Sequence, residues 1–139
     1  MTTAVHDEID MTPIDIAKDY IRAVQTGDHA TLSRLMAPDI VCHQPGRNRF
    51  SGEHRGPAAV GNMISGMMQV SAGTFAISRA VRFMENYGWV AVDIEFQAQR
   101  NGMGLAQSGI DLLRIENDQI VEARLFSSDQ NAEDAFWGR

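Results

Sequence analysis

The N-terminal part of the chain has the pattern of an amphipathic helix. Its apolar positions recur at the spacing of one helix face, at Ile14, Ala17, Ile21 and Val24. Thr12 is a suitable cap, Pro13 suits the first helical turn, and Gly27 can end the helix. We therefore predict a helix over residues 13–26.

Two further helices and one strand follow before residue 74. The stretch HATLSRLMA, residues 29–37, predicts a short helix with Asp28 as its cap and Pro38 after its end. The stretch DIVCHQ, residues 39–44, predicts a short strand that runs into a loop rich in glycine and polar residues. A third helix is expected from about Pro57 to Val70.

From Thr74 onward, apolar residues recur with a period of two, which is typical of strands. Turn signals at ENYG, RNGMG and END separate four expected strands, at residues 74–84, 88–99, 104–115 and 119–127. Helices followed by a meander indicate an α+β domain whose helices cover one face of a strongly curved antiparallel sheet. We expect a flexible segment over residues 1–11 and a single domain over residues 12–139.

Composition narrows the class of protein. The chain has 139 residues, of which 44% are hydrophobic and 22% charged, and its net charge is −6. The negative charge argues against nucleic-acid binding, and no apolar run reaches the roughly 18 residues that a membrane-spanning helix needs. The lone cysteine, Cys42, excludes an intramolecular disulfide, so we expect a cytoplasmic protein.

Three residues are candidates for acid–base chemistry. Asp111 has apolar neighbours in the middle of a strand, where a carboxylate is costly to bury unless it is paired or protonated. His43 ends a buried strand, and Tyr20 flanks the apolar face of the first helix. Structural roles are alternatives for each: an arginine partner for Asp111, a loop carbonyl for His43 and simple packing for Tyr20. Together they provide a base and two hydrogen-bond donors, which proton abstraction next to a carbonyl requires.

Three stretches resemble the ketosteroid isomerase branch of the NTF2-like (SnoaL-like) superfamily. They are DYIRAVQTGDHATLSRLMAPDIVCHQPG, FSGEHRGPAAV and SGIDLLRIENDQIVEARLF, and the likeness covers roughly residues 13–127. The resemblance implies a cone-shaped barrel in which a tyrosine of the first helix and a protonated aspartic acid of a late strand stabilise an enolate. An aspartate on the first strand moves the proton in that branch.

The resemblance assigns roles to residues of this chain. Tyr20 matches the family tyrosine, and Asp111 matches the aspartic acid that precedes an apolar pair. Counting back from Ser51 and Gly52 places His43 at the proton-shuttling position, whereas counting forward from Gly27 places Gln44 there. We favour His43, since Pro45 and Gly46 fix the end of the strand near the cavity mouth.

The expected function is that of an isomerase or cyclase that needs no cofactor and acts on a hydrophobic steroid-like or polyketide-like carbonyl compound. Tyr20, His43 and Asp111 are its expected catalytic residues. The expected pocket lining consists of Met63, Met67, Phe83, Trp89 and Phe126. A non-catalytic small-molecule-binding protein is the alternative, and an outward-facing His43 would favour it. A further alternative is an epoxide hydrolase or dehydratase, in which Asp111, Asp93 and Arg124 would converge on a water.

Three other expectations concern metals, the tail and assembly. The four histidines show no ligand-pair spacing, so no metal site is expected. Asp129 is expected to cap the terminal segment, in which Phe136 and Trp137 close either the pocket or a subunit interface. A homodimer is expected through an outer sheet face formed by Val90, Val92, Ile94 and Phe96.

Overall fold

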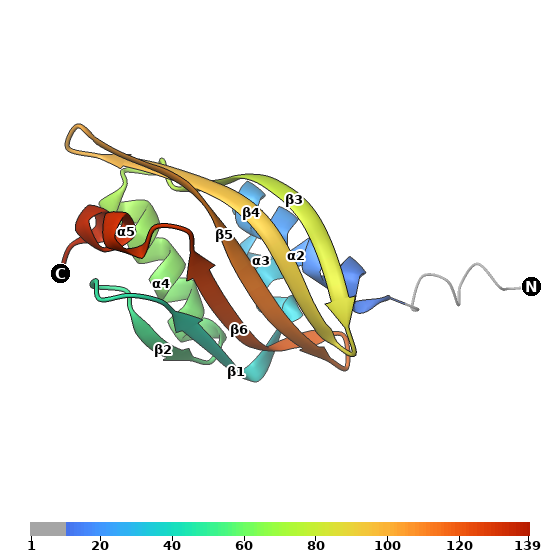
Figure 1. The fold of residues 1–139 in the computed structure, drawn as a ribbon. Helices are drawn as coiled ribbons and strands as arrows, with labels where there is room; N and C mark the ends of the chain where they lie inside the picture. The colour runs from blue at the N-terminus through green and yellow to red at the C-terminus, as the bar shows by residue number, and fades with distance from the viewer. Residues whose placement is uncertain (1–10) are drawn as a thin grey trace, which may run out of the picture.

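The computed structural model describes residues 11–139, in which four helices and six strands are found (Figure 1). The segment expected to be flexible, residues 1–11, lies outside the described residues except for Met11, which packs against the core. In chain order the elements are α2 (Pro13–Thr26), α3 (His29–Leu35), β1 (Met36–Gln44), β2 (Gly52–Arg55), α4 (Pro57–Val70), β3 (Ala76–Asn86), β4 (Trp89–Arg100), β5 (Met103–Glu116), β6 (Gln119–Ser127) and α5 (Gln130–Trp137). None of these helices is long and apolar enough to cross a bilayer.

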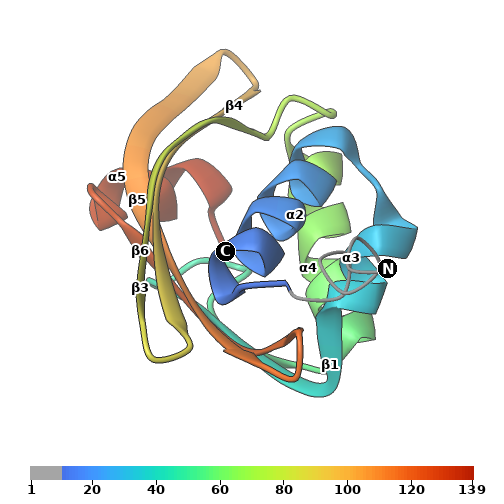
Figure 2. The same cartoon turned by 90° about the vertical axis from the view of Figure 1, so that its right-hand side faces the viewer.

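The six strands form one curved sheet in the order β2-β1-β6-β5-β4-β3. The predicted meander of β3, β4, β5 and β6 is confirmed, and each of its neighbouring pairs is antiparallel. The sheet is mixed rather than purely antiparallel, because β1 runs parallel to β6. Figure 2 shows the sheet curling around α2 and leaving one side open, with α3 and α4 beyond that helix. The expected α+β architecture, with helices inside a cone-like sheet, is therefore confirmed.

Helix α2 begins and ends where its sequence predicts. The Thr12 hydroxyl accepts a hydrogen bond from the Asp15 backbone, and the Asp15 side chain accepts one from the Thr12 backbone, which makes a capping box. Gly27 ends the helix with a left-handed φ of 69°, a conformation that costs glycine little. These two ends fix the helix position, and its buried face includes Tyr20.

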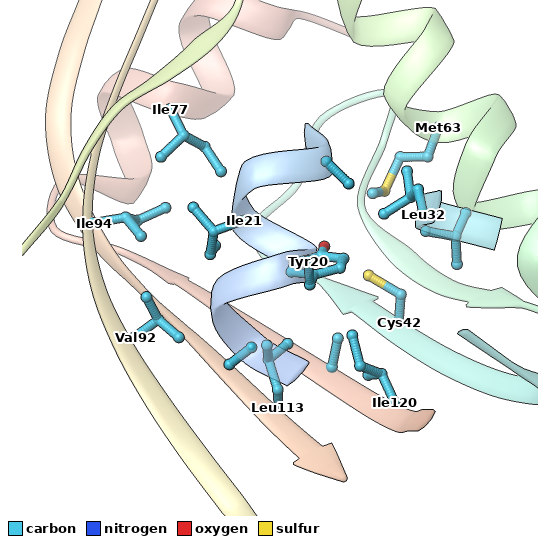
Figure 3. Close-up of a cluster of buried hydrophobic side chains, with 14 of the residues drawn as sticks. Tyr20, Ile21, Leu32, Cys42, Met63, Ile77, Val92, Ile94, Leu113 and Ile120 are labelled. Carbon is cyan, nitrogen blue, oxygen red and sulfur yellow. The ribbon is translucent and has the colours of Figure 1, made fainter. Parts of the chain in front are cut away.

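Strand β4 corrects one expectation. Four apolar residues that we expected on the outer face, Val90, Val92, Ile94 and Phe96, are all buried and belong to the core beneath the helices. Figure 3 shows Val92 and Ile94 among these core side chains. The positions that alternate with these residues, including Trp89 and Asp93, point to the opposite face. The expected homodimer therefore cannot use these four side chains, because they already pack inside the sheet.

The segments between the helices also differ from the prediction. Helix α3 ends at Leu35, and β1 begins at Met36, which pairs with Ile120 of β6. Met36 and Ala37 therefore belong to the strand, although the sequence pattern alone predicts that they belong to the helix. Strand β2 was not predicted, since its sequence GEHR is polar and carries no alternation of apolar and polar residues.

An aromatic contact joins α4, the loop before β2 and the terminal helix. The ring of Phe50 meets Trp137 edge-on, with 5.3 Å between ring centroids, and Trp137 is fully buried. Gly66 of α4 lies so close to Phe50 that an added Cβ would be 2.8 Å from its Cε1 atom. Close packing on this glycine therefore helps to hold α5 over one end of the sheet.

The two glycines within α4 give a matched test of this contact. A Cβ at Gly61 would meet no atom within 4 Å, in contrast to one at Gly66. Gly61→Ala is expected to stabilise the fold by about 1 kcal/mol, because alanine is the better helix former. Gly66→Ala should be less stable than Gly61→Ala, because the added Cβ would collide with Phe50, which Trp137 holds in place. Urea unfolding measures both variants, and equal stabilisation would contradict the proposed close packing.

Candidate functional site

A cavity of about 70 Å³ lies between α2, α4, α5 and the inner face of the sheet. Its walls are mainly apolar and come from Val24, Pro45, Met63, Ile64, Met67, Phe75, Ile77, Ile94, Phe96, Leu125 and Phe126. Five polar side chains complete the lining, namely Tyr20, Gln44, Asp111, Ser127 and Glu133. A mostly apolar cavity with a few convergent polar groups is the usual form of a small-molecule site.

Asp111 reaches the cavity from the middle of β5. The predicted alternation is confirmed, because Asp111 lies on the buried face with Leu113 and is only 7% exposed. Among the described residues its carboxyl makes no hydrogen bond or ion pair, so the alternative of an arginine partner does not apply. Burial, and to a smaller extent the negative charge of Glu133, raises the pKa of Asp111 to about 7.

Tyr20 enters the same cavity from α2, where Figure 3 shows it beside Cys42. Burial raises the pKa of its hydroxyl well above the usual value, and the neighbouring Asp111 and Cys42 add to this effect. The hydroxyl therefore stays neutral and available as a hydrogen-bond donor. The structure thus brings together two of the three expected catalytic residues, Tyr20 and Asp111.

Glu133, from α5, is a buried carboxyl that sequence reasoning missed. Its Oε1 accepts a hydrogen bond of 2.6 Å from the Ser127 hydroxyl and one of 3.2 Å from the Gln130 amide. Its Oε2 accepts from the Trp137 indole at 3.1 Å and from the Gln44 amide at 3.4 Å. These contacts tie the terminal helix to β1 and β6, and they place a second carboxylate in the cavity wall.

The tail carried a signal that could have revealed Glu133. Asp129 caps α5 as predicted, by accepting a hydrogen bond of 3.1 Å from the Ala132 backbone. Once Asp129 is taken as the N-cap of a helix, Glu133 and Trp137 lie four apart on one helix face. The spacing alone thus places a carboxyl beside an indole N–H.

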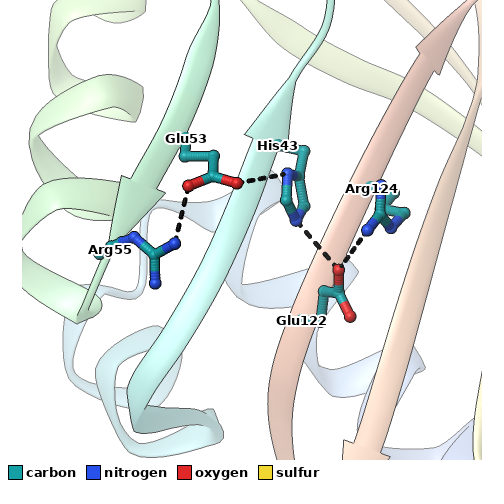
Figure 4. A network of polar contacts seen from close by, with 5 residues as sticks. All are labelled: His43, Glu53, Arg55, Glu122 and Arg124. Carbon is teal, nitrogen blue, oxygen red and sulfur yellow. Dashed lines mark hydrogen bonds and ion pairs between the residues drawn. The ribbon is translucent and has the colours of Figure 1, made fainter.

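His43 does not enter the cavity, which corrects the predicted site. Its Nε2 lies 3.0 Å from Glu122 Oε2, and its Nδ1 lies 3.7 Å from Glu53 Oε2 (Figure 4). Glu122 also pairs with Arg124, so His43 belongs to a charged cluster on the outer face of the sheet. Gln44 is the residue that lines the cavity, because successive strand residues face opposite ways.

The expected lining is only partly found around the cavity. Met63 and Met67 are buried in its wall, and Phe126 lies at its edge with 53% of its surface exposed. Phe83 instead packs beneath Lys18, whose Nζ lies 5.6 Å from the ring centre. Trp89 stacks with Arg114, with 5.5 Å between the guanidinium and the ring. The structure thus places Phe83 and Trp89 away from the cavity.

The residues expected for water or epoxide chemistry do not converge. Asp93 pairs with Arg82 at 2.9 Å, and Arg124 pairs with Glu122, whereas Asp111 lies on the opposite face of the sheet. Within residues 11–139, no three His, Cys, Asp or Glu side chains gather as a possible metal site. His6, one of the four histidines considered above, lies outside this range.

The raised pKa of Asp111 predicts a pH dependence of stability. The folded state holds this proton more tightly than the unfolded chain, because the pKa rises from 3.8 to about 7 on folding. The stabilisation is full below about pH 4 and is lost as the pH rises through 7, up to about 4 kcal/mol in all. Asp111→Asn should remove this loss, and urea unfolding between pH 4 and 8 measures it. Asp93→Asn is the control, and an unchanged pH slope in Asp111→Asn would contradict the assignment.

Comparisons with known proteins agree with this fold. The model of the SnoaL-like domain family matches residues 17–123. A protein of unknown function with a cystatin-like fold from Xanthomonas campestris is 61% identical, with a TM-score of 0.89 over 93% of this chain and all of that one. Bal32a, from a soil-derived mobile gene cassette, is 25% identical, with a TM-score of 0.86 over 90% of this chain and 95% of its own.

A more distant structure shares the fold alone. It is a candidate polyketide cyclase from Sinorhizobium meliloti, 16% identical, with a TM-score of 0.66 over 83% of this chain and 99% of that one. A search of curated proteins found no match. The family match covers most of the chain, so this protein belongs to the SnoaL-like family and has the NTF2-like fold.

Proposed function

We propose that this protein is an enzyme that moves a proton next to the carbonyl group of a small, largely apolar compound. The observation that carries the proposal is the buried carboxyl of Asp111, which faces a mainly apolar cavity without a hydrogen-bond partner among the described residues. The Tyr20 hydroxyl shares that cavity. A proton-transferring group and a neutral donor are the two components that enolate chemistry needs.

The proposed mechanism uses each group in one role. With a pKa of about 7, Asp111 is accessible in both protonation states near neutral pH, which suits a general base. Its carboxylate takes the proton from the carbon beside the carbonyl, while Tyr20 donates a hydrogen bond to the oxygen that becomes the enolate. Return of the proton at another carbon completes an isomerisation. Attack of the enolate carbon on a second carbonyl of the same molecule instead forms a ring, and the alkoxide that results takes the proton back from Asp111.

This mechanism differs from the one that the ketosteroid isomerase resemblance implied. There His43 was the expected base, and Asp111 was a protonated donor beside Tyr20. His43 lies on the outer face, so Asp111 is the group that the proposal makes the base. Tyr20 keeps its expected role.

The size of the cavity favours a small substrate. A volume of about 70 Å³ holds several water molecules, since one water needs roughly 10–15 Å³ on this measure. This room favours a compound much smaller than a steroid. The apolar walls favour uncharged rings, with the carbonyl oxygen directed at Tyr20.

A binding protein without catalysis is the second candidate. The outward position of His43 favours it, because that position leaves the cavity without the expected imidazole base. In this alternative, Tyr20 and Asp111 bind the oxygen of a ligand, and no bond to carbon is broken.

Hydrogen exchange on simple ketones tests the catalytic proposal. In D₂O the protein should speed deuterium incorporation beside the carbonyl of 2-cyclohexenone or 1-indanone, followed by NMR. Asp111→Asn should lower the protein-dependent rate about 100-fold or more, since it removes the base. Tyr20→Phe should lower it about 10-fold to 100-fold, since it removes one donor to the enolate.

His43→Gln is the matched control for this assay, because His43 lies outside the cavity. It should leave the exchange rate unchanged. Loss of exchange in His43→Gln together with full exchange in Asp111→Asn would overturn the proposed roles. Exchange no faster than in buffer for all ketones, with ligand binding intact, would favour the binding protein.

Binding of a phenol tests the site itself. The compound 2-naphthol places a hydroxyl on a flat apolar ring system and so resembles an enolate. Tyr20→Phe and Asp111→Asn should each weaken its binding about tenfold or more, because each removes a hydrogen bond to the ligand oxygen. Fluorescence titration measures the affinities. Equal affinity in the wild type and both variants would show that these groups do not hold the ligand oxygen.

A further inference from the structure

The cavity contains two buried carboxyl groups whose surroundings are opposite. Asp111 and Glu133 both line it, and they are 7% and 4% exposed. Hydrogen bonds hold the Glu133 carboxylate on both oxygens, whereas Asp111 has no such bond among the described residues. Two titratable groups in contrasting environments commonly have different roles in a site.

The hydrogen bonds of Glu133 use all of its acceptor positions. A carboxylate offers about four lone-pair sites, and four side chains donate to this one at 2.6–3.4 Å. Its donors are a hydroxyl, an indole and two amides, all of which are neutral. These hydrogen bonds therefore fix the position of the Glu133 carboxylate, and no acceptor site is left free for a proton from a ligand.

Few ionisable groups face Asp111 in the described part of the chain. They are Tyr20 from α2, Cys42 from β1 and Glu133 from α5. The strands beside Asp111 and helix α4 supply apolar or neutral polar side chains to the cavity. Burial raises the pKa of the Cys42 thiol to about 12, and the Tyr20 hydroxyl is also neutral. Glu133 is thus the one charged group among the three.

We propose that Glu133 is a positioning residue whose fixed negative charge favours the protonated form of Asp111 and so strengthens Asp111 as a base. This inference rests on the proposed function, in which Asp111 takes a proton from carbon. A proton leaves carbon more readily when the accepting carboxylate binds protons more tightly. A like charge nearby has this effect, because protonation of Asp111 relieves the repulsion between the two carboxylates.

An NMR titration of the Asp111 side-chain carboxyl tests this inference without any substrate. In Glu133→Gln the midpoint should fall by about one pH unit, the size of effect that a nearby charge commonly has. Asp134→Asn is the matched control, because it removes a charge from the neighbouring residue of α5. The Asp134 carboxyl is held by Asn48, Arg47 and Gln130 and does not line the cavity. In the Asp134→Asn variant the midpoint of the Asp111 titration should equal that of the wild type.

The Glu133→Gln variant has hydrogen-bond partners that allow it to fold. The Ser127 hydroxyl can accept as well as donate, and the Gln130 amide can turn over to offer its oxygen. A second variant, Glu133→Gln with Gln44→Glu, keeps a carboxylate and an amide at the same contact. The Asp111 midpoint in this double variant should stay near that of the wild type.

Each outcome decides the inference. An unchanged midpoint in folded Glu133→Gln, an equal fall in Asp134→Asn, or a fall in the double variant would overturn it. The ketone exchange assay distinguishes a failure of this inference from a failure of the proposed function. A midpoint that falls in Glu133→Gln, in a protein that exchanges no ketone, would support the charge effect and remove the catalytic role. Normal exchange in Glu133→Gln with an unchanged midpoint would leave Asp111 as the base and exclude the role of Glu133.

Discussion

The alternation of side chains across the curved sheet is the constraint on which the rest of this structure depends. A residue on β1, β4, β5 or β6 faces either the helices or the outside, and its neighbour faces the other way. This rule buries Val92 and Asp111 on the same face and separates His43 from Gln44. The chemistry of the cavity is therefore decided by position along a strand as much as by residue type.

Sequence reasoning predicted the structure correctly where a local pattern in the sequence and the pairing of the strands favour the same arrangement. The capping box and Gly27 define α2, Pro57 and Val70 bound α4 as predicted, and alternation along β5 places Asp111 inside. It failed where pairing between distant strands decides the outcome. The side on which His43 lies depends on how β1 pairs with β6. Of the two counts along the sequence, the forward count from Gly27 gives Gln44, which lines the cavity, whereas the backward count from Ser51 and Gly52 gives His43, which does not.

The two carboxyl groups of the cavity show how different surroundings give similar side chains different roles. Asp111 and Glu133 carry the same functional group, but one faces an apolar space and the other is surrounded by donors. No pattern in the sequence near Asp111 indicates Glu133, because the two residues meet only after the terminal helix folds back. Their relation arises from tertiary structure, which explains why sequence analysis found one carboxyl and missed the other.

The terminal helix has a consequence for how this family can diversify. The region matched by the family model ends at residue 123, whereas Glu133 lies beyond it and still lines the cavity, held there by the indole of Trp137. A change in this short tail alters the polarity of the cavity without changing β5, the strand that carries Asp111. The chemistry at one end of this scaffold can thus change through the terminal segment alone, in the way that loops vary function on other folds.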